Sequence, residues 1–232
     1  MKIITGSIHM NYFHQWTNEK RAGLPTGKVI CVGRNYADHA QELQNPVPKE
    51  PLLFMKPQTA IVSLYEPIAI PQSKGEVHYE AEIAVLVGRE LKNADKDQAT
   101  KGIAGIGVAL DLTLRDLQSQ LKQEGHPWEK AKAFDGSCPL SRFEPIASFH
   151  SLNNLEIEFI LSDIVKQKGS SAQMLFDIAS LMEYISGCFT LQPGDVVLTG
   201  TPKGVGPLTP GNTVQIRLND IIAVRTTVTV EA

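Results

Sequence analysis

The sequence contains few cysteines and no long apolar run. Its three cysteines, Cys31, Cys138 and Cys188, are an odd number without CxxC spacing, which argues against a disulfide framework and against a zinc or iron–sulfur site. No stretch approaches the length of a membrane span, and the first residues lack the apolar core and cleavage site of a secretion signal. We therefore expect a cytoplasmic protein with reduced thiols, of which Cys31 and Cys188 have core-like neighbours.

A surplus of one charge is also absent. The 22 Lys and Arg residues nearly balance the 25 Asp and Glu residues, the net charge is -3, and the charges are scattered along the chain. This pattern favours neither nucleic acid nor an anionic membrane as a partner, so a small solute is the better expectation. At 232 residues with 42% hydrophobic content, the chain can bury a sizeable core as one domain.

Glycine and proline, at 18 and 14 residues, interrupt the chain often, so short apolar runs predict many strands and few helices. Strands are expected at residues 28–32, 52–55, 77–87, 105–112, 155–161, 196–198, 214–218 and 222–230, with a hairpin turn at 218–220. Because strands do not alternate regularly with helices, a strand-dominated α+β fold is favoured over a doubly wound parallel sheet. Residues 1–26 have weak periodicity and are expected to form a lead-in segment before the main domain at 27–232.

Two helices are predicted. The first spans residues 113–124, where Thr113 and Asp116 resemble a capping box and Gly125 is placed to end the helix. The second spans residues 174–186, where apolar residues recur at helical spacing.

Three acidic residues form a candidate metal site. In the strand-like segment EVHYEAEIAVLVG, Glu80 and Glu82 share one face, about 7 Å apart along the strand. A solvated acidic face is the plain alternative. Asp111 ends the next long strand, where it could also cap a helix. Together the three carboxylates would hold Mg²⁺ or Mn²⁺ and leave about half of an octahedral shell open for water and substrate.

A histidine and a glutamate form a candidate proton-transfer pair. His39 and Glu42 stand at i and i+3 in RNYADHAQE, so on a helical turn Glu42 could hold the imidazole in one tautomer while His39 takes a proton from water. At this spacing such a pair is also common as surface decoration.

Cationic and polar residues offer substrate contacts. Arg115 and Gln118 share a helix face, where Arg115 could clamp a carboxylate or pair structurally with an acid. Lys132 lies among small and apolar residues and could polarise a carbonyl, or be a surface ammonium with a buried stem. The loop TGTPKGVG lacks the spacing of a phosphate loop, and its backbone N–H groups and the hydroxyl of Thr199 or Thr201 suit a small carboxylate instead.

Six segments, taken in order, resemble the fumarylacetoacetate hydrolase family: VGRNYADHAQE, LFMKP, HYEAEIAVLVG, LDLTLRDLQ, PWEKAKAFDGSCP and LTGTPKGVGP. They are most similar to its single-domain acylpyruvase and oxaloacetate decarboxylase branch. The resemblance runs from about Gly27 to Pro207 and more loosely to the C-terminus. It implies a mixed β-roll with a few helices, and a homodimer.

The resemblance also implies roles for individual residues. A divalent Mg²⁺ or Mn²⁺ ion would be held by Glu80, Glu82 and Asp111. The remaining roles fall on His39, Glu42 and Lys132 as catalytic residues, and on Arg34, Arg115, Gln118 and Thr201 as substrate-binding residues.

The activity expected from this resemblance is metal-dependent hydrolysis of 3-acylpyruvates to pyruvate and a carboxylate. Decarboxylation of oxaloacetate and isomerisation or tautomerisation of 2-oxo diacids are the alternatives, because all three reactions pass through the same kind of enolate. A non-catalytic metal- or ligand-binding domain is the alternative outside enzymes, and it gives no reason for His39, Glu42, Gln118 and Lys132 to accompany the acids.

Overall fold

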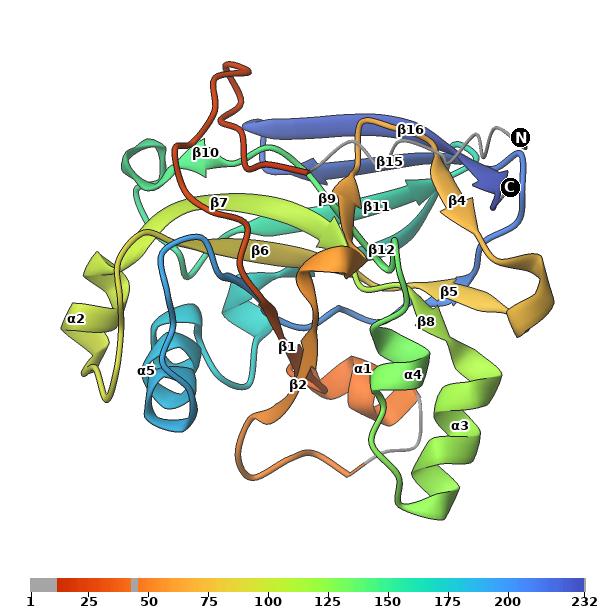
Figure 1. Cartoon of the computed structure of the whole chain (residues 1–232), viewed down its shortest axis with the longest axis horizontal. Coiled ribbons are helices and arrows are strands. Elements are labelled where there is room, and N and C mark those ends of the chain that lie inside the picture. The colour runs from red at the N-terminus through yellow and green to blue at the C-terminus, as the bar shows by residue number, and fades with distance from the viewer. Residues whose placement is uncertain (1–11, 43–45, 232) are drawn as a thin grey trace, which may run out of the picture.

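Three β-sheets contain most of the regular structure in the computed structural model, which describes residues 12–42 and 46–231 (Figure 1). The largest sheet has the order β2 (Leu52–Lys56), β1 (Val29–Gly33), β13 (Val196–Leu198), β6 (Ala81–Val87), β7 (Ile103–Leu110), β9 (Cys138–Leu140) and β3 (Ile61–Ser63), with β10 (Glu144–Pro145) paired to β7. The second has the order β12 (Ile164–Ser170), β11 (Glu156–Leu161), β15 (Thr213–Leu218), β16 (Ile222–Val230) and β4 (Ile68–Ile70). The third consists of β14 (Gly206–Pro207), β5 (Val77–Tyr79) and β8 (Thr113–Leu114).

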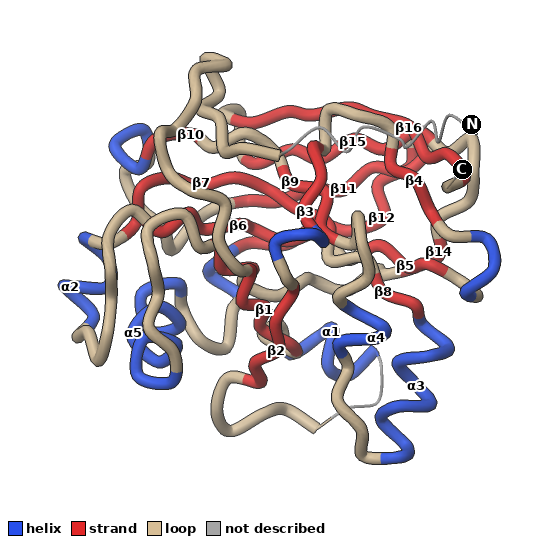
Figure 2. Tube along the Cα trace, viewed as in Figure 1, coloured by secondary structure: helices blue, strands red, loops and turns tan. Residues whose placement is uncertain are grey.

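Helices are short and few in the described residues. The α-helices are α1 (Ala37–Glu42), α2 (Lys96–Lys101), α3 (Arg115–Glu124), α4 (Glu129–Lys132) and α5 (Ile178–Cys188), and 3-10 turns lie at Gln58–Ala60, Gln72–Lys74, Ile146–Ser148 and Ser171–Gln173. Figure 2 shows the α-helices gathered along one side of the strand-rich body. The predicted strand-dominated α+β class is confirmed. None of the described helices has the length and apolar character needed to cross a membrane.

Strand β6 is covered on both faces. Ile83 packs in a core that includes Phe159 of β11 and Ile216 of β15, whereas Ala84 and Leu86 pack in a second core on the opposite face. All seven residues of β6 are buried. Since burying a large aliphatic side chain contributes about 1.5–3 kcal/mol, this strand is a rigid base for the polar residues at its start.

Most predicted strands are present within two residues of their expected limits, as β1, β2, β7, β11, β13, β15 and β16. The hairpin turn between β15 and β16 is also present, and Asn219 adopts the left-handed conformation there, with φ of 47°. Its side chain accepts a hydrogen bond from the backbone N–H of Glu156 at 2.7 Å.

Helix α3 begins two residues later than predicted. Thr113 and Leu114 form β8 and pair with β5, so the first helical residue is Arg115. The N-cap is Leu114 and makes no side-chain capping bond, so the predicted capping box is wrong. Gly125 ends the helix as expected, with φ of 67° and its N–H bonded to the last helical turn.

Helix α5 also differs from the prediction. It begins at Ile178, where Asp177 caps it by accepting the N–H of Ser180 at 2.7 Å. Met174 is not helical, because it is extended, with ψ of 139°, and pairs with Tyr36 in a β-bridge. The helix extends to Cys188, which is exposed. The expectation that Cys188 lies in the core is therefore wrong.

The other two cysteines are buried, as the sequence indicates for Cys31. Burial raises the pKa of Cys138 to about 12, so this thiol stays protonated at neutral pH. In the described part of the lead-in segment, Gln15 pairs with Arg21 across a short turn and Trp16 pairs with Phe143. The segment thus contains a small hairpin that contacts the main body.

Candidate active site

A break between β5 and β6 places the first two acidic residues. The predicted continuous strand at 77–87 is wrong at Glu80, where pairing changes from β8 to β7. At the break, the backbone N–H of Ala81 donates to the side chain of Gln167 at 2.9 Å instead of to a strand. Residues that a regular strand would keep about 7 Å apart can therefore converge.

Glu80, Glu82 and Asp111 converge in the interior. Each offers a carboxylate oxygen, and these oxygens lie within 4.8 Å of one another. The three residues are 5%, 2% and 1% exposed, so the alternative of a solvated acidic face is wrong. Asp111 does not cap a helix either, because α3 begins at Arg115.

Three cations surround two of these acids. Lys132 Nζ lies 2.7 Å from Glu80 Oε2 and 2.6 Å from Asp111 Oδ2, and Arg115 Nη2 lies 2.6 Å from Glu80 Oε1. Lys56 Nζ lies 2.8 Å from Asp111 Oδ1. Burial raises the pKa of Glu80, but Lys132 and Arg115 outweigh it, and the pKa is well below the ordinary value. Glu80 is therefore ionised, and its contacts with Lys132 and Arg115 fix its side chain. Lys132 is 2% exposed, so it is not the surface ammonium of the alternative interpretation.

Glu82 is compensated least. It accepts the backbone N–H of Gly200 at 2.6 Å, and burial, followed by the charges of Asp111 and Glu80, raises its pKa well above the ordinary value. A carboxylate in this position favours either a proton or an added cation.

These residues fit a divalent metal ion. Asp111 Oδ1 is buried and accepts no hydrogen bond, although Lys56 Nζ lies 2.8 Å away in an ion pair. The donors are all carboxylate oxygens, which hard cations such as Mg²⁺ and Mn²⁺ prefer. An ion beside Asp111 and Glu82 would satisfy the orphaned oxygen and offset the charge that now raises the pKa of Glu82.

The loop after β13 supplies backbone groups to the same place. Gly200 has φ of 97°, and a Cβ on it would lie 2.7 Å from Asn35 Cβ, so only glycine brings this N–H to Glu82 without strain. Thr201 Oγ1 donates to Ala81 O at 2.9 Å and accepts from Gln167 Nε2 at 2.8 Å. Thr201 faces the pocket, but its hydroxyl is already used in holding the strand break.

The predicted histidine–glutamate pair is present on α1. His39 Nδ1 lies 3.2 Å from Glu42 Oε2, and Glu42 also accepts the N–H of Gly204 at 3.0 Å. His39 is 5% exposed, so its imidazole is buried, whereas Glu42 is exposed. Because Glu42 occupies Nδ1, Nε2 is the nitrogen left for a substrate or water.

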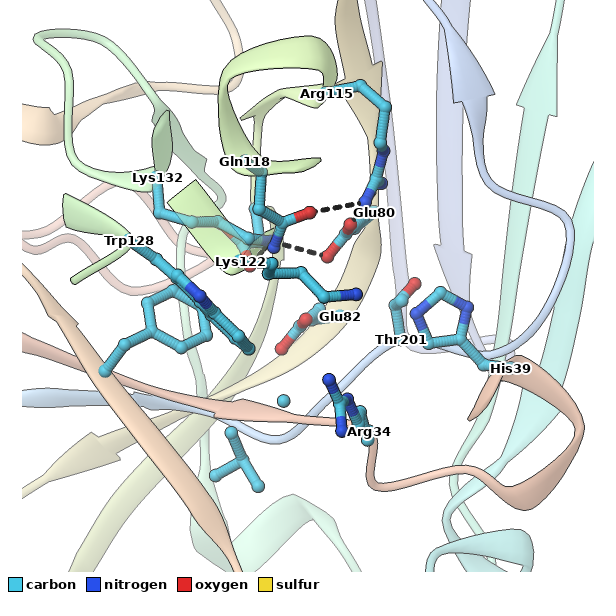
Figure 3. Close-up of a pocket in the computed structure, with 14 residues that line it drawn as sticks. Arg34, His39, Glu80, Glu82, Arg115, Gln118, Lys122, Trp128, Lys132 and Thr201 are labelled. Atoms are coloured by element: carbon cyan, nitrogen blue, oxygen red, sulfur yellow. Dashed lines mark hydrogen bonds and ion pairs between the residues drawn. The ribbon is translucent and has the colours of Figure 1, made fainter. Parts of the chain in front are cut away.

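One pocket of about 40 Å³ joins these groups (Figure 3). A water needs about 10–15 Å³ of such space, so the pocket suits an ion with a few waters. Nine of the ten predicted site residues line it. The exception is Glu42, which contacts the lining residue His39. Gln118 lines it while accepting a hydrogen bond from Arg115 at 2.7 Å.

Several residues that shape the site carry little local signal. Phe54, Lys122 and Trp128 also line the pocket. Lys56 stood in the family-like segment LFMKP, and its fully buried ammonium reaches Asp111. Gln167 lies in the polar strand β12, which the apolar pattern missed, and it is 1% exposed.

Replacing Gln167 by methionine is expected to lower the free energy of unfolding by about 2–4 kcal/mol, because the buried Ala81 N–H and other partners lose a hydrogen bond at about 1–3 kcal/mol each. Urea titration measures this change. Lys168→Met on the same strand is the control, since its side chain is 67% exposed and only 3.6 Å from Glu158 in a surface ion pair, worth about 0–1 kcal/mol. Equal stability of the two variants would refute the role of Gln167.

Comparison with known proteins agrees with this geometry. The model of the fumarylacetoacetate (FAA) hydrolase C-terminal family matches residues 28–229. Oxaloacetate tautomerase YcgM of Escherichia coli K12 is 50% identical over 204 residues, covering 88% of this chain and 93% of that protein. The mitochondrial oxaloacetate decarboxylase of Dictyostelium discoideum is 41% identical over 189 residues, covering 81% and 87%.

A solved structure supports the same assignment. Fumarylpyruvate hydrolase from Pseudomonas aeruginosa, in complex with Mn²⁺ and pyruvate, superimposes with a TM-score of 0.89 at 30% identity, covering 98% of this chain and 99% of that one. The sheet arrangement expected from the sequence resemblance is thereby confirmed. The chain belongs to the fumarylacetoacetate hydrolase family.

Proposed function

We propose that this protein is a divalent-metal-dependent enzyme that acts on oxaloacetate, with keto–enol tautomerisation as its main reaction and decarboxylation as a second. The observation that carries the proposal is the group of three buried carboxylates within 4.8 Å of one another, beside the His39–Glu42 pair. The relatives at 50% and 41% identity are named for oxaloacetate reactions. Hydrolysis of 3-acylpyruvates, the reaction first expected from the sequence, has weaker support, because the named hydrolase is 30% identical.

The metal ion would be held by Glu80, Glu82 and Asp111. When bound, it would act as a Lewis acid for the negative charge that develops on the 2-oxo oxygen. Lys132 and Arg115 fix Glu80 before the substrate arrives. These contacts limit the reorganisation needed during the reaction.

His39 is the group placed to move a proton. In tautomerisation, the C3–H bond breaks, its electron pair forms the C2=C3 double bond, and the π pair of the C2=O bond moves to oxygen. That oxygen then receives a proton from the imidazolium, directly or through water, which returns His39 to its neutral form. His39 Nε2 would take the proton from C3, while Glu42 at Nδ1 holds the ring and stabilises the imidazolium. In decarboxylation the C3–C4 bond breaks instead, carbon dioxide leaves with the electron pair of that bond remaining on the enolate, and C3 gains a proton from water to give pyruvate.

Three expectations from the sequence remain proposals. These are a homodimer, a cytoplasmic location, and a division into a lead-in segment at 1–26 and a catalytic domain at 27–232. The match to the family model begins at residue 28, one residue after the proposed boundary. The choice between Mg²⁺ and Mn²⁺ is likewise part of the proposal.

The test compares three substrates with purified protein and either metal. The ultraviolet absorbance of enol-oxaloacetate follows tautomerisation, coupled lactate dehydrogenase follows pyruvate release, and acetylpyruvate tests hydrolysis. We expect tautomerisation to be fastest and EDTA to abolish all turnover. Metal-dependent hydrolysis of acetylpyruvate without any effect on oxaloacetate would support the hydrolase instead, and metal binding without turnover would support the binding domain.

A further inference from the structure

Two cationic side chains at the pocket entrance have no part in the metal site. Arg34 follows β1, and Lys122 lies in the last turn of α3. Both line the pocket that contains the three carboxylates. Figure 3 shows them reaching it from opposite sides, with Lys122 above and Arg34 below. Lys122 is exposed and Arg34 half-buried, so they stand at the entrance while the acids lie at the base.

The backbone of Arg34 is unusual. Its φ is 60°, a left-handed conformation that non-glycine residues rarely adopt. Such strain persists only where the surrounding structure imposes it, and it clusters at ligand sites. The next residue, Asn35, is held in place because its side chain donates to Thr199 O at 2.8 Å and to Phe176 O at 3.0 Å.

The entrance has a positive character. Burial, followed by the charges of Arg34 and Arg115, lowers the pKa of Lys122, and burial lowers the pKa of Arg34. Arg115 is already paired with Glu80, and Arg34 forms no ion pair with any residue of the described ranges 12–42 and 46–231. An anion bound between the two side chains would relieve their repulsion.

We propose that Arg34 and Lys122 bind the second carboxylate of a 2-oxo dicarboxylic acid, and that this contact favours proton transfer at C3 over loss of carbon dioxide. This inference rests on the proposed function. The end of the substrate that carries the 2-oxo group would bind at the metal ion that the three carboxylates at the base of the pocket would hold. The second carboxylate then points outward, toward the two cations.

The effect on the reaction follows from where the charge goes. During tautomerisation the second carboxylate keeps its negative charge, so both cations bind it equally before and during proton transfer. During decarboxylation its charge moves to the enolate as the C3–C4 bond breaks and neutral carbon dioxide forms. The cations therefore stabilise the ground state more than the transition state, which raises the barrier to decarboxylation.

The test uses Lys122→Met and Arg34→Asn, since asparagine tolerates the left-handed backbone, with exposed Lys130→Met on α4 as the control. Losing one charged contact is expected to raise KM for oxaloacetate about tenfold or more. The ratio of pyruvate formed to tautomer formed should rise several-fold at saturation, while KM for acetylpyruvate, which has one carboxylate, should not change. An equal rise in KM for both substrates, or an unchanged product ratio, would overturn the proposal.

A binding measurement separates this inference from the proposed function. Calorimetry on Mn²⁺-loaded protein compares pyruvate with 3,3-difluorooxaloacetate, which lacks a C3 hydrogen and cannot enolise. We expect the diacid to bind more tightly to the wild type, and Lys122→Met to remove that difference without affecting pyruvate. If the diacid binds more tightly and Lys122→Met removes that difference, but oxaloacetate is not turned over, then the carboxylate contact is supported and the proposed function is refuted. Turnover without the binding difference would refute the contact alone.

Discussion

Glu82→Gln is expected to abolish turnover while making the metal-free protein more stable at pH 8. Glutamine can still accept the N–H of Gly200, so the loop keeps its place. It cannot supply the negative oxygen that a metal ion needs. Changes to groups that only support metal ligands cost about 10–100-fold, so we expect kcat/KM to fall at least about a hundredfold for oxaloacetate.

The gain in stability follows from the raised pKa of Glu82, which burial and the charges of Asp111 and Glu80 cause. The folded state binds this proton more tightly than the unfolded state does. Stability of the metal-free wild type therefore falls as pH rises from the unfolded carboxyl pKa, about 4.3, through the higher folded value. Glutamine does not ionise, so Glu82→Gln does not lose stability in this way as pH rises. A gain of about 1 kcal/mol would raise Tm by about 2–4 °C.

Thermal unfolding at pH 5 and pH 8, with EDTA and with Mn²⁺, measures both effects. Wild type should gain stability from Mn²⁺ at pH 8, and Glu82→Gln should not. Glu76→Gln serves as control, because that carboxylate is 63% exposed beside His78. If Mn²⁺ still raises the Tm of Glu82→Gln as it does for the wild type, Glu82 is not a ligand of the metal ion.

His39→Ala is expected to slow tautomerisation and acetylpyruvate hydrolysis about a hundredfold, the low end for losing a positioned proton-transfer group. Decarboxylation should fall less than about tenfold, since carbon dioxide leaves without removal of a proton from C3. Stopped-flow absorbance and coupled pyruvate release measure the two losses in one preparation.

The control for this variant is His126→Ala, whose side chain is 60% exposed on the loop after α3. It should leave all three rates unchanged. Equal loss of kcat/KM for tautomerisation and decarboxylation in His39→Ala would show that His39 supports binding or folding and not proton transfer.

The strands were predictable because local alternation and β-branched runs report burial directly. The errors occur where a distant residue replaces a local hydrogen bond. At Glu80 the strand is interrupted because Gln167 takes the Ala81 N–H. The helix expected from residue 174 starts late because Met174 is extended and pairs with the distant Tyr36. Periodicity within a short window contains no information about such partners.

The candidate site was predictable to a similar extent. The spacing of Glu80 and Glu82 indicated a shared face, and the structure brings Asp111 to them. Their burial was not foreseen, because it depends on cations from other segments. The residues next to Lys56 in the sequence do not indicate its role. Lys122 has the sequence pattern of an ordinary surface residue, and only the fold shows that it lines the pocket.

The ion pairs of Lys132, Lys56 and Arg115 bear on whether this protein folds before or after it binds its metal ion. In small zinc domains, the ligands are not held together before the ion binds, so metal binding and folding are one process. Here two of the three acids are already neutralised by side chains of the same chain. The polypeptide can therefore fold without the ion, and the folded protein can then exchange one divalent ion for another as the concentrations of free metal ions change.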